Sequence, residues 1–205
     1  MKKKIIAIED FIDKEKSVLK SKTKRLTFPL SDEDKNIIAL MKEMLFTLEG
    51  VGLAAPQIGI NKNIAVIYIP ETASLLRDDA KIYPMHTLIN AEYEPVEDQG
   101  KYRDFEACYS VKTVCGQVPR YNVIKVKYQN EEGIEISKIE AGFYARVLQH
   151  EIDHLNGILI TDVFTPDCLQ GTFEEIAKLR KESLTEEKKI LFDKLLKKKT
   201  LKQED

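Results

Sequence analysis

The segment His150-Glu151-Ile152-Asp153-His154 places two histidines four residues apart, with an acidic residue directly after the first. Residues four apart share one face of an α-helix, so both imidazoles can bind the same metal ion. Glu151 then lies where it can take a proton from a water molecule on that ion. The chain has only three histidines among 205 residues, and two of them fall in this pattern. The pattern therefore predicts a metal site on a helix.

A hydrolytic zinc or iron site normally has three protein ligands and an open position for water. One metalloprotease pattern requires a further histidine six residues after His154, but Ile160 occupies that position. Glu174 lies 20 residues after His154, a spacing that would suit a zinc endopeptidase. Cys108 is another candidate, from a neighbouring strand. These residues alone leave Glu174 and Cys108 open as the third ligand.

A run of small residues, Gly-Val-Gly-Leu-Ala-Ala-Pro-Gln, occupies positions 50–57. Small residues let the backbone approach a ligand closely. The run ends at Gln57, whose side-chain amide can donate a hydrogen bond to an oxyanion. The run is therefore a candidate wall of the same site.

Three segments in this order resemble the motifs of the peptide deformylase family: residues 50–57, 106–110 and 149–155. The resemblance runs from about residue 5 to about residue 165. The second segment reads Glu-Ala-Cys-Tyr-Ser, where the family usually has Glu-Gly-Cys-Leu-Ser. Ala107 and Tyr109 are therefore departures, and Lys112-Thr113 stands where many members have Pro-Gly.

The resemblance implies hydrolysis of the N-formyl group from the N-terminal formyl-methionine of newly synthesised polypeptides, with release of formate. It implies three metal ligands, namely Cys108, His150 and His154. It also implies three catalytic groups: Glu151 as the proton carrier, and the Gln57 amide and the backbone N–H of Tyr109 as oxyanion donors. The substrate-binding residues by motif position are Gly52, which would pair with the peptide backbone, and Phe143, Arg146 and Val147, which would line the methionine pocket.

One thiolate and two imidazoles suit Fe(II), Zn(II), Ni(II) or Co(II) by their softness. The resemblance implies Fe(II) in cells. The expected partner is a formyl-methionyl nascent peptide, and a ribosome contact by the Lys-rich C-terminal stretch is a further hypothesis. Because Ala107 and Tyr109 alter the second motif, we also consider a repurposed relative that binds peptide ends with altered activity.

Other reactive residues favour structural roles. We expect Glu106 to form a salt bridge with Arg103 or Arg120, and His86 to be a structural histidine in an apolar strand. The two remaining cysteines are expected to be plain thiols: Cys115 and Cys168.

The site requires a helix over about residues 142–156, with an apolar face and Gly157 as its stop. Ser31 and Asp34 predict the capped start of an earlier helix, which continues to about residue 48. Residues 1–30 are expected to form an extended arm with turns, and residues 71–83 a surface loop. The expected strands cover residues 63–69, 86–93, 123–128 and 134–139.

Strands cluster in one stretch of the chain, which favours an α+β fold. We expect mostly antiparallel β-sheets around the central metal-binding helix, with a C-terminal helix outside. Residues 1–170 would form the catalytic domain, and residues 171–205 a charged helical extension.

Composition excludes several other classes. A net charge of −2 provides no basic field for DNA, and an odd count of three cysteines favours a reducing compartment over a disulfide framework. The apolar run at residues 5–8 is too short for a signal peptide, and no run approaches the roughly 20 apolar residues of a membrane helix. We therefore expect a cytoplasmic protein that does not bind membranes.

Overall fold

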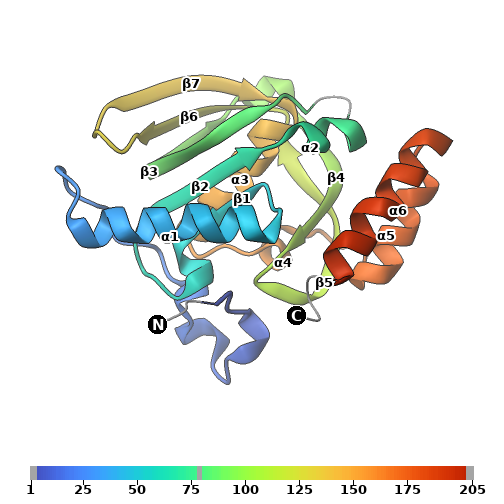
Figure 1. The fold of residues 1–205 in the computed structure, drawn as a ribbon, viewed down its shortest axis with the longest axis horizontal. Coiled ribbons are helices and arrows are strands. Elements are labelled where there is room, and N and C mark those ends of the chain that lie inside the picture. Colours follow the sequence, from blue (N-terminus) through green and yellow to red (C-terminus); the bar gives the residue numbers. More distant parts are fainter. Residues whose placement is uncertain (1–3, 78–79, 202–205) are drawn as a thin grey trace.

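Two antiparallel sheets enclose a central helix in the computed structural model, which describes residues 4–77 and 80–201. The larger sheet has the strand order β1-β2-β3-β6-β7, and the smaller has the order β4-β5-β8 (Figure 1). The strands are β1 (Gly52–Ala54), β2 (Ile64–Ile69), β3 (Tyr83–Pro95), β4 (Lys101–Cys108), β5 (Val111–Tyr121), β6 (Val123–Gln129), β7 (Glu135–Ala141) and β8 (Gln170–Gly171). The helices are α1 (Asp32–Leu48), α2 (Glu71–Leu76), α3 (Gly142–Leu155), α4 (Ile160–Val163), α5 (Phe173–Glu182) and α6 (Glu186–Leu201).

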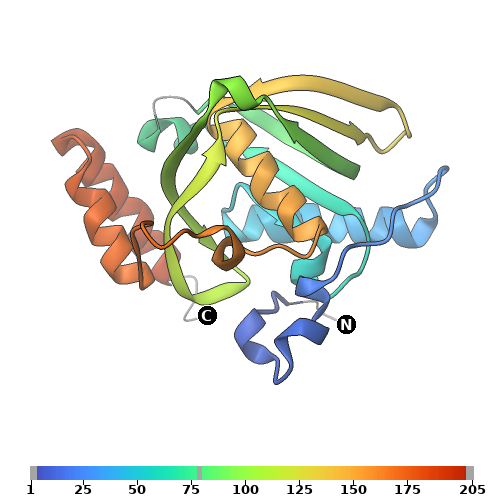
Figure 2. The same ribbon diagram turned by 180° about the vertical axis from the view of Figure 1, so that it is seen from behind.

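The α+β prediction is confirmed, and β2 shows how the layers form. Successive side chains of a strand point to opposite faces. Ile64 and Val66 pack in the apolar cluster that contains α1, whereas Ala65 and Ile67 pack in the cluster that contains α3. The central sheet is therefore covered on one face by α1 and on the other by α3 (Figures 1 and 2).

Both predicted helix boundaries are confirmed. Ser31 accepts a hydrogen bond from the Asp34 N–H, and the Asp34 carboxylate accepts from the Ser31 N–H, so the first turn of α1 is capped. Helix α3 ends at Leu155 and is followed by Gly157 at φ 75°. A Cβ at Gly157 would also lie 2.6 Å from the Lys20 backbone, so this stop additionally permits close packing of the N-terminal arm.

The prediction of a surface loop over residues 71–83 is wrong. Residues Glu71–Leu76 form α2, and β3 already begins at Tyr83. Pro70 precedes the helix, and Ala73 packs against the central core. Tertiary packing therefore stabilises a helix that the polar composition of this segment did not indicate.

The N-terminal arm contains three single turns of 3₁₀ helix, at Ile8–Asp10, Lys14–Lys16 and Val18–Lys20. At the other end, α5 and α6 lie beside the smaller sheet, and α5 contacts β4 and β5 (Figure 1). The division at residue 170 stays a prediction. Among the described residues, no helix combines the length and apolar character needed to cross a membrane.

Candidate metal centre

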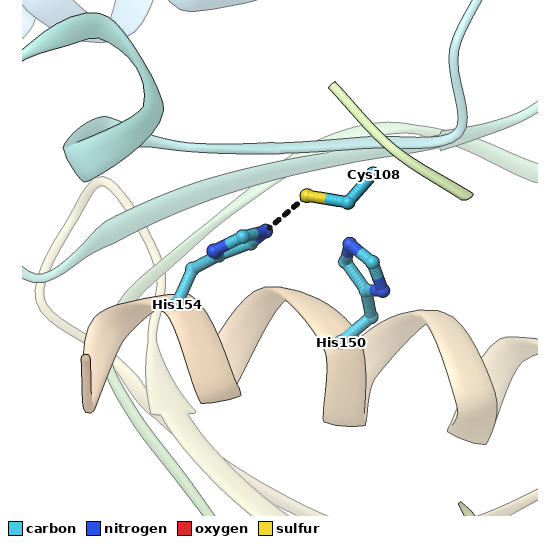
Figure 3. Close-up of side chains that lie close together, drawn as sticks. All are labelled: Cys108, His150 and His154. Atoms are coloured by element: carbon cyan, nitrogen blue, oxygen red, sulfur yellow. Dashed lines mark hydrogen bonds between the residues drawn. The ribbon is translucent and has the colours of Figure 1, made fainter. Parts of the chain in front are cut away.

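Three potential ligands from two distant parts of the chain converge on one point. His150 and His154 rise from one side of α3 toward the sulfur of Cys108, which ends β4 (Figure 3). One ligand atom from each residue lies within 4.8 Å of the other two, and the Cys108 sulfur is 3.2 Å from His154 Nε2. The helical spacing thus presents both imidazoles to one sulfur.

Local hydrogen bonds hold the Cys108 sulfur at this position. The Ser110 N–H donates to Sγ at 3.4 Å, from the turn between β4 and β5. The Gln57 amide nitrogen approaches the same sulfur at 3.8 Å, while the Gln57 oxygen accepts a 2.8 Å bond from the Ala54 N–H. The amide is therefore oriented with its N–H groups toward the centre.

Glu106 orients the first histidine. Its Oε2 lies 2.9 Å from His150 Nδ1, which leaves His150 Nε2 available as a ligand. Burial raises the pKa of Glu106, but the charges and hydrogen bonds of Arg120 and His150 together outweigh burial and keep this pKa well below its usual range. A carboxylate thus remains ionised beneath the imidazole.

The predicted salt bridge of Glu106 with Arg120 is confirmed, whereas Arg103 pairs with Asp167 instead. Arg120 also reaches Asp153 on α3. Sequence reasoning missed Asp153, although an acidic residue between two inward-facing histidines was a usable signal. Together these groups connect β4, β5 and α3 around the centre.

Arg146 has an ionic contact that sequence reasoning did not anticipate. Its guanidinium donates to Glu106 Oε1 at 2.6 Å, to the Val118 carbonyl at 2.8 Å and to the Tyr102 carbonyl at 3.0 Å. Only 2% of the residue is exposed. Phe143 and Val147 are buried on the same helix. The assignment of Arg146, Phe143 and Val147 to a methionine pocket stays a prediction.

Glu151 is buried beside the ligands with one free oxygen. Its Oε2 has no hydrogen-bond partner among the described residues, and burial raises its pKa to about 7. A Cβ built on Gly52 would lie 2.3 Å from Glu151 Oε1, so the backbone of β1 packs directly against the carboxyl group. The absence of a side chain at Gly52 leaves this space to Glu151.

The remaining candidates lie elsewhere. Glu174 is exposed on α5, outside the ligand cluster, so the geometry does not support the endopeptidase alternative. His86 has the predicted structural contacts, with Nδ1 2.8 Å from the Pro84 carbonyl and Nε2 2.8 Å from the Tyr144 hydroxyl. The other two cysteines are buried free thiols, Cys115 and Cys168.

The residues present fit a divalent metal ion. A sulfur and two imidazole nitrogens form a donor set typical of iron, zinc, cobalt or nickel. The unpartnered oxygen of buried Glu151 lies next to this set, where a polar group bound to an ion would satisfy it. The centre therefore has both the ligands and the neighbouring acid of a hydrolytic metal site.

Comparison with known proteins gives one consistent result. Peptide deformylase 2 of Rickettsia conorii is 37% identical over 184 residues, covering 88% of this chain and 90% of the relative. The peptide deformylase of Halothermothrix orenii is 41% identical over 145 residues, covering 71% of this chain and 86% of the relative.

Solved structures agree with this result. The Thermotoga maritima peptide deformylase matches with a TM-score of 0.66 and 31% identity, over 81% of this chain and 99% of that one. The Met-Ala-Ser-bound class I type b enzyme of Acinetobacter baumannii matches with a TM-score of 0.67 and 27% identity, over 80% of this chain and 99% of that one. The sequence model for polypeptide deformylase matches residues 8–169. This chain therefore belongs to the polypeptide deformylase family.

Proposed function

We propose that this protein removes the formyl group from the N-terminal formyl-methionine of newly made polypeptides by metal-dependent hydrolysis. The observation that carries the proposal is the convergence of Cys108, His150 and His154 beside the buried carboxyl group of Glu151. The membership of the chain in the polypeptide deformylase family supports the same reaction.

Cys108, His150 and His154 would hold the ion, which supplies Lewis-acid chemistry by lowering the pKa of water from about 15.7 toward about 7. Glu151 accepts a proton from the attacking water at its free Oε2 and passes that proton to the leaving amine. Burial raises the pKa of Glu151 to about 7. A carboxyl group with this pKa can both accept and donate a proton near neutral pH.

Two donors would stabilise the negative charge that develops on the formyl oxygen. One is the Gln57 amide, whose nitrogen is directed toward the Cys108 sulfur at 3.8 Å. The other is the backbone N–H of Tyr109, which directly follows the ligand Cys108. A single donor of this kind typically contributes about 2.7–4 kcal/mol to the transition state.

The free edge of β1 is the proposed docking line for the peptide. β1 ends the larger sheet and, within the described part of the chain, pairs with β2 alone, so its outer edge can add a peptide strand at Gly52. Phe143, Val147 and the alkyl part of Arg146 would receive the methionine side chain. The tripeptide Met-Ala-Ser bound to the Acinetobacter baumannii relative supports a peptide substrate of this kind.

We further propose Fe(II) as the ion in cells, with Zn(II), Ni(II) or Co(II) as substitutes, and the cytoplasm as the place of action. Nascent chains appear at ribosomes, and the Lys-rich stretch at residues 197–199 is the proposed contact. The side chains of these lysines lie outside the described part of the structure.

Formate release from formyl-Met-Ala-Ser, measured with anaerobic, iron-loaded protein, tests the proposal. Hydrolysis is the expected result, and peptide binding without turnover would favour a repurposed relative.

The metal content of two variants separates the alternatives for the third ligand. Cys108→Ala is expected to lose the ion, whereas the matched variant Glu174→Ala retains it; the reverse pattern would indicate an endopeptidase-type centre.

A further inference from the structure

The side chain of Tyr109 bridges two walls of the candidate site. Tyr109 follows the ligand Cys108 at the end of β4, and its hydroxyl donates a 3.1 Å hydrogen bond to the Leu48 carbonyl. Leu48 is the last residue of α1, where carbonyl groups lack partners within the helix. The bond therefore satisfies the helix end and holds the tyrosine ring in place.

The ring lies tightly against Gly50, at the start of the loop that leads into β1. A Cβ built on Gly50 would be 2.8 Å from the Tyr109 hydroxyl oxygen and 3.1 Å from its Cε2. Real Cβ atoms do not approach other atoms at the shorter of these distances. Tyr109 therefore occupies the space beside Gly50 that a bulky neighbouring group would need.

The direction of a bound peptide follows from the ends of β1. Gln57 follows the C-terminal end of β1 and faces the Cys108 sulfur, and Gly52 at the N-terminal end of β1 contacts Glu151. The reacting formyl group therefore belongs alongside β1, between Gly52 and Gln57. A peptide that pairs with the free edge of β1 then extends back toward Gly50. With the methionine opposite Gly52, the residue after it lies about 3.3 Å further along, opposite Val51 and directly beside Gly50 and the tyrosine ring that packs against Gly50.

We propose that Tyr109 is a specificity-determining residue that restricts the second position of the formyl-peptide to small side chains. This inference rests on the proposed function and names the part of the substrate that the site would select. Glycine, alanine and serine leave the ring and its bond to Leu48 undisturbed. A leucine or phenylalanine in the second position must displace the ring from Gly50 and break that bond.

The experiment compares kcat/KM for formyl-Met-Xaa-Ser peptides in which Xaa is Gly, Ala, Leu or Phe, with iron-loaded full-length protein. The native protein is expected to prefer Gly and Ala over Leu and Phe by roughly tenfold or more, the scale of steric discrimination in a packed pocket. Tyr109→Leu keeps the backbone N–H and is expected to bring the ratio close to one. Tyr109→Phe keeps the ring but loses the Leu48 bond, so its ratio should lie between the two.

The ratio of kcat/KM for small against large second residues is taken within each variant, so a general change in activity does not affect it. Tyr68→Leu is the matched control, because Tyr68 packs in the α1 cluster on β2, and its ratio should equal the native one. Equal rates for all four peptides in the native protein would overturn the inference, as would a native preference that survives in Tyr109→Leu. Failure of the native protein to hydrolyse any of the peptides would instead refute the proposed function.

Discussion

Replacing Glu106 with glutamine tests whether a buried ionic network holds the metal centre together. The Glu106 carboxylate accepts two 3.0 Å bonds from Arg120, a 2.6 Å bond from Arg146 and a 2.9 Å contact with His150. Its side chain is 7% exposed, and both arginine side chains are 2% exposed. Solvent therefore screens these charges very little.

Glutamine preserves the shape of this side chain and removes its charge. Arg120 would keep its pairing with the buried Asp153, whose carboxylate also accepts a bond from the Tyr93 hydroxyl, whereas Arg146 would lose its carboxylate partner. Removing one partner of a buried ion pair costs about 3–5 kcal/mol, because the other charge is left without compensation. We expect Glu106→Gln to lower the free energy of unfolding by about 3 kcal/mol. Loss of the contact that orients His150 should weaken metal binding by roughly 10–100-fold.

A second substitution identifies the cause. Arg146→Met removes the excess cation while retaining an apolar stem, so the double variant with Glu106→Gln should be more stable than Glu106→Gln alone. Recovery is expected to be partial, because Arg146 also donates to the Val118 carbonyl. A double-mutant cycle between positions 106 and 146 should give a coupling of about 1–3 kcal/mol.

Urea unfolding in excess chelator measures stability without the contribution of bound metal. Competition between the protein and a chelator for Co(II) measures affinity separately. Glu131→Gln is the matched control: Glu131 pairs with Lys42 near the surface, so its loss should cost about 1 kcal/mol or less. The reasoning is refuted if Glu106→Gln resembles this control in both assays, or if the double variant is the less stable one.

Three further predictions concern single groups. Because burial raises the pKa of Glu151 from 4.5 to about 7, the folded metal-free protein binds this proton more tightly than the unfolded chain does. This group's stabilising contribution is complete below pH 4.5 and is lost as pH rises through 7, a change of up to about 3 kcal/mol. Urea unfolding across this range should show the loss relative to Glu151→Gln, and parallel profiles would contradict it. Gly52→Ala should reduce kcat roughly 100-fold because its Cβ displaces Glu151, and an unchanged kcat would show that the carboxyl group tolerates the shift. Ser31→Ala should cost about 1 kcal/mol by uncapping α1, measured as a lower urea midpoint with activity retained; an unchanged midpoint would show that the cap contributes nothing.

Part of this protein's structure could be predicted from its sequence, because it depends on interactions between residues that are close together in the chain. The spacing of His150 and His154 predicts a shared helix face because side chains four residues apart lie one turn apart. The capping of α1 by Ser31 and Asp34 is equally local, since each side chain bonds the backbone three residues away. The α+β class and the family resemblance were also accessible, because the segments that carry them are short and contiguous.

Contacts between distant segments needed the tertiary structure. Sequence spacing left both Cys108 and Glu174 open, and only the family resemblance favoured Cys108. The path of β4 places Cys108 beside His154, 46 residues away along the chain. The bond from Tyr109 to Leu48 joins residues 61 apart. The helical conformation of residues 71–76 likewise depends on packing against the core.

Arg146 shows the physical reason most clearly. Helical spacing indicates that it faces inward, but not whether its guanidinium meets substrate, solvent or a buried acid. The register of β4 against β5 places Glu106 and the Val118 carbonyl around it, and that register is set by pairing along both strands. Short-range sequence therefore determined which groups could do chemistry here, while long-range strand pairing decided which of them meet.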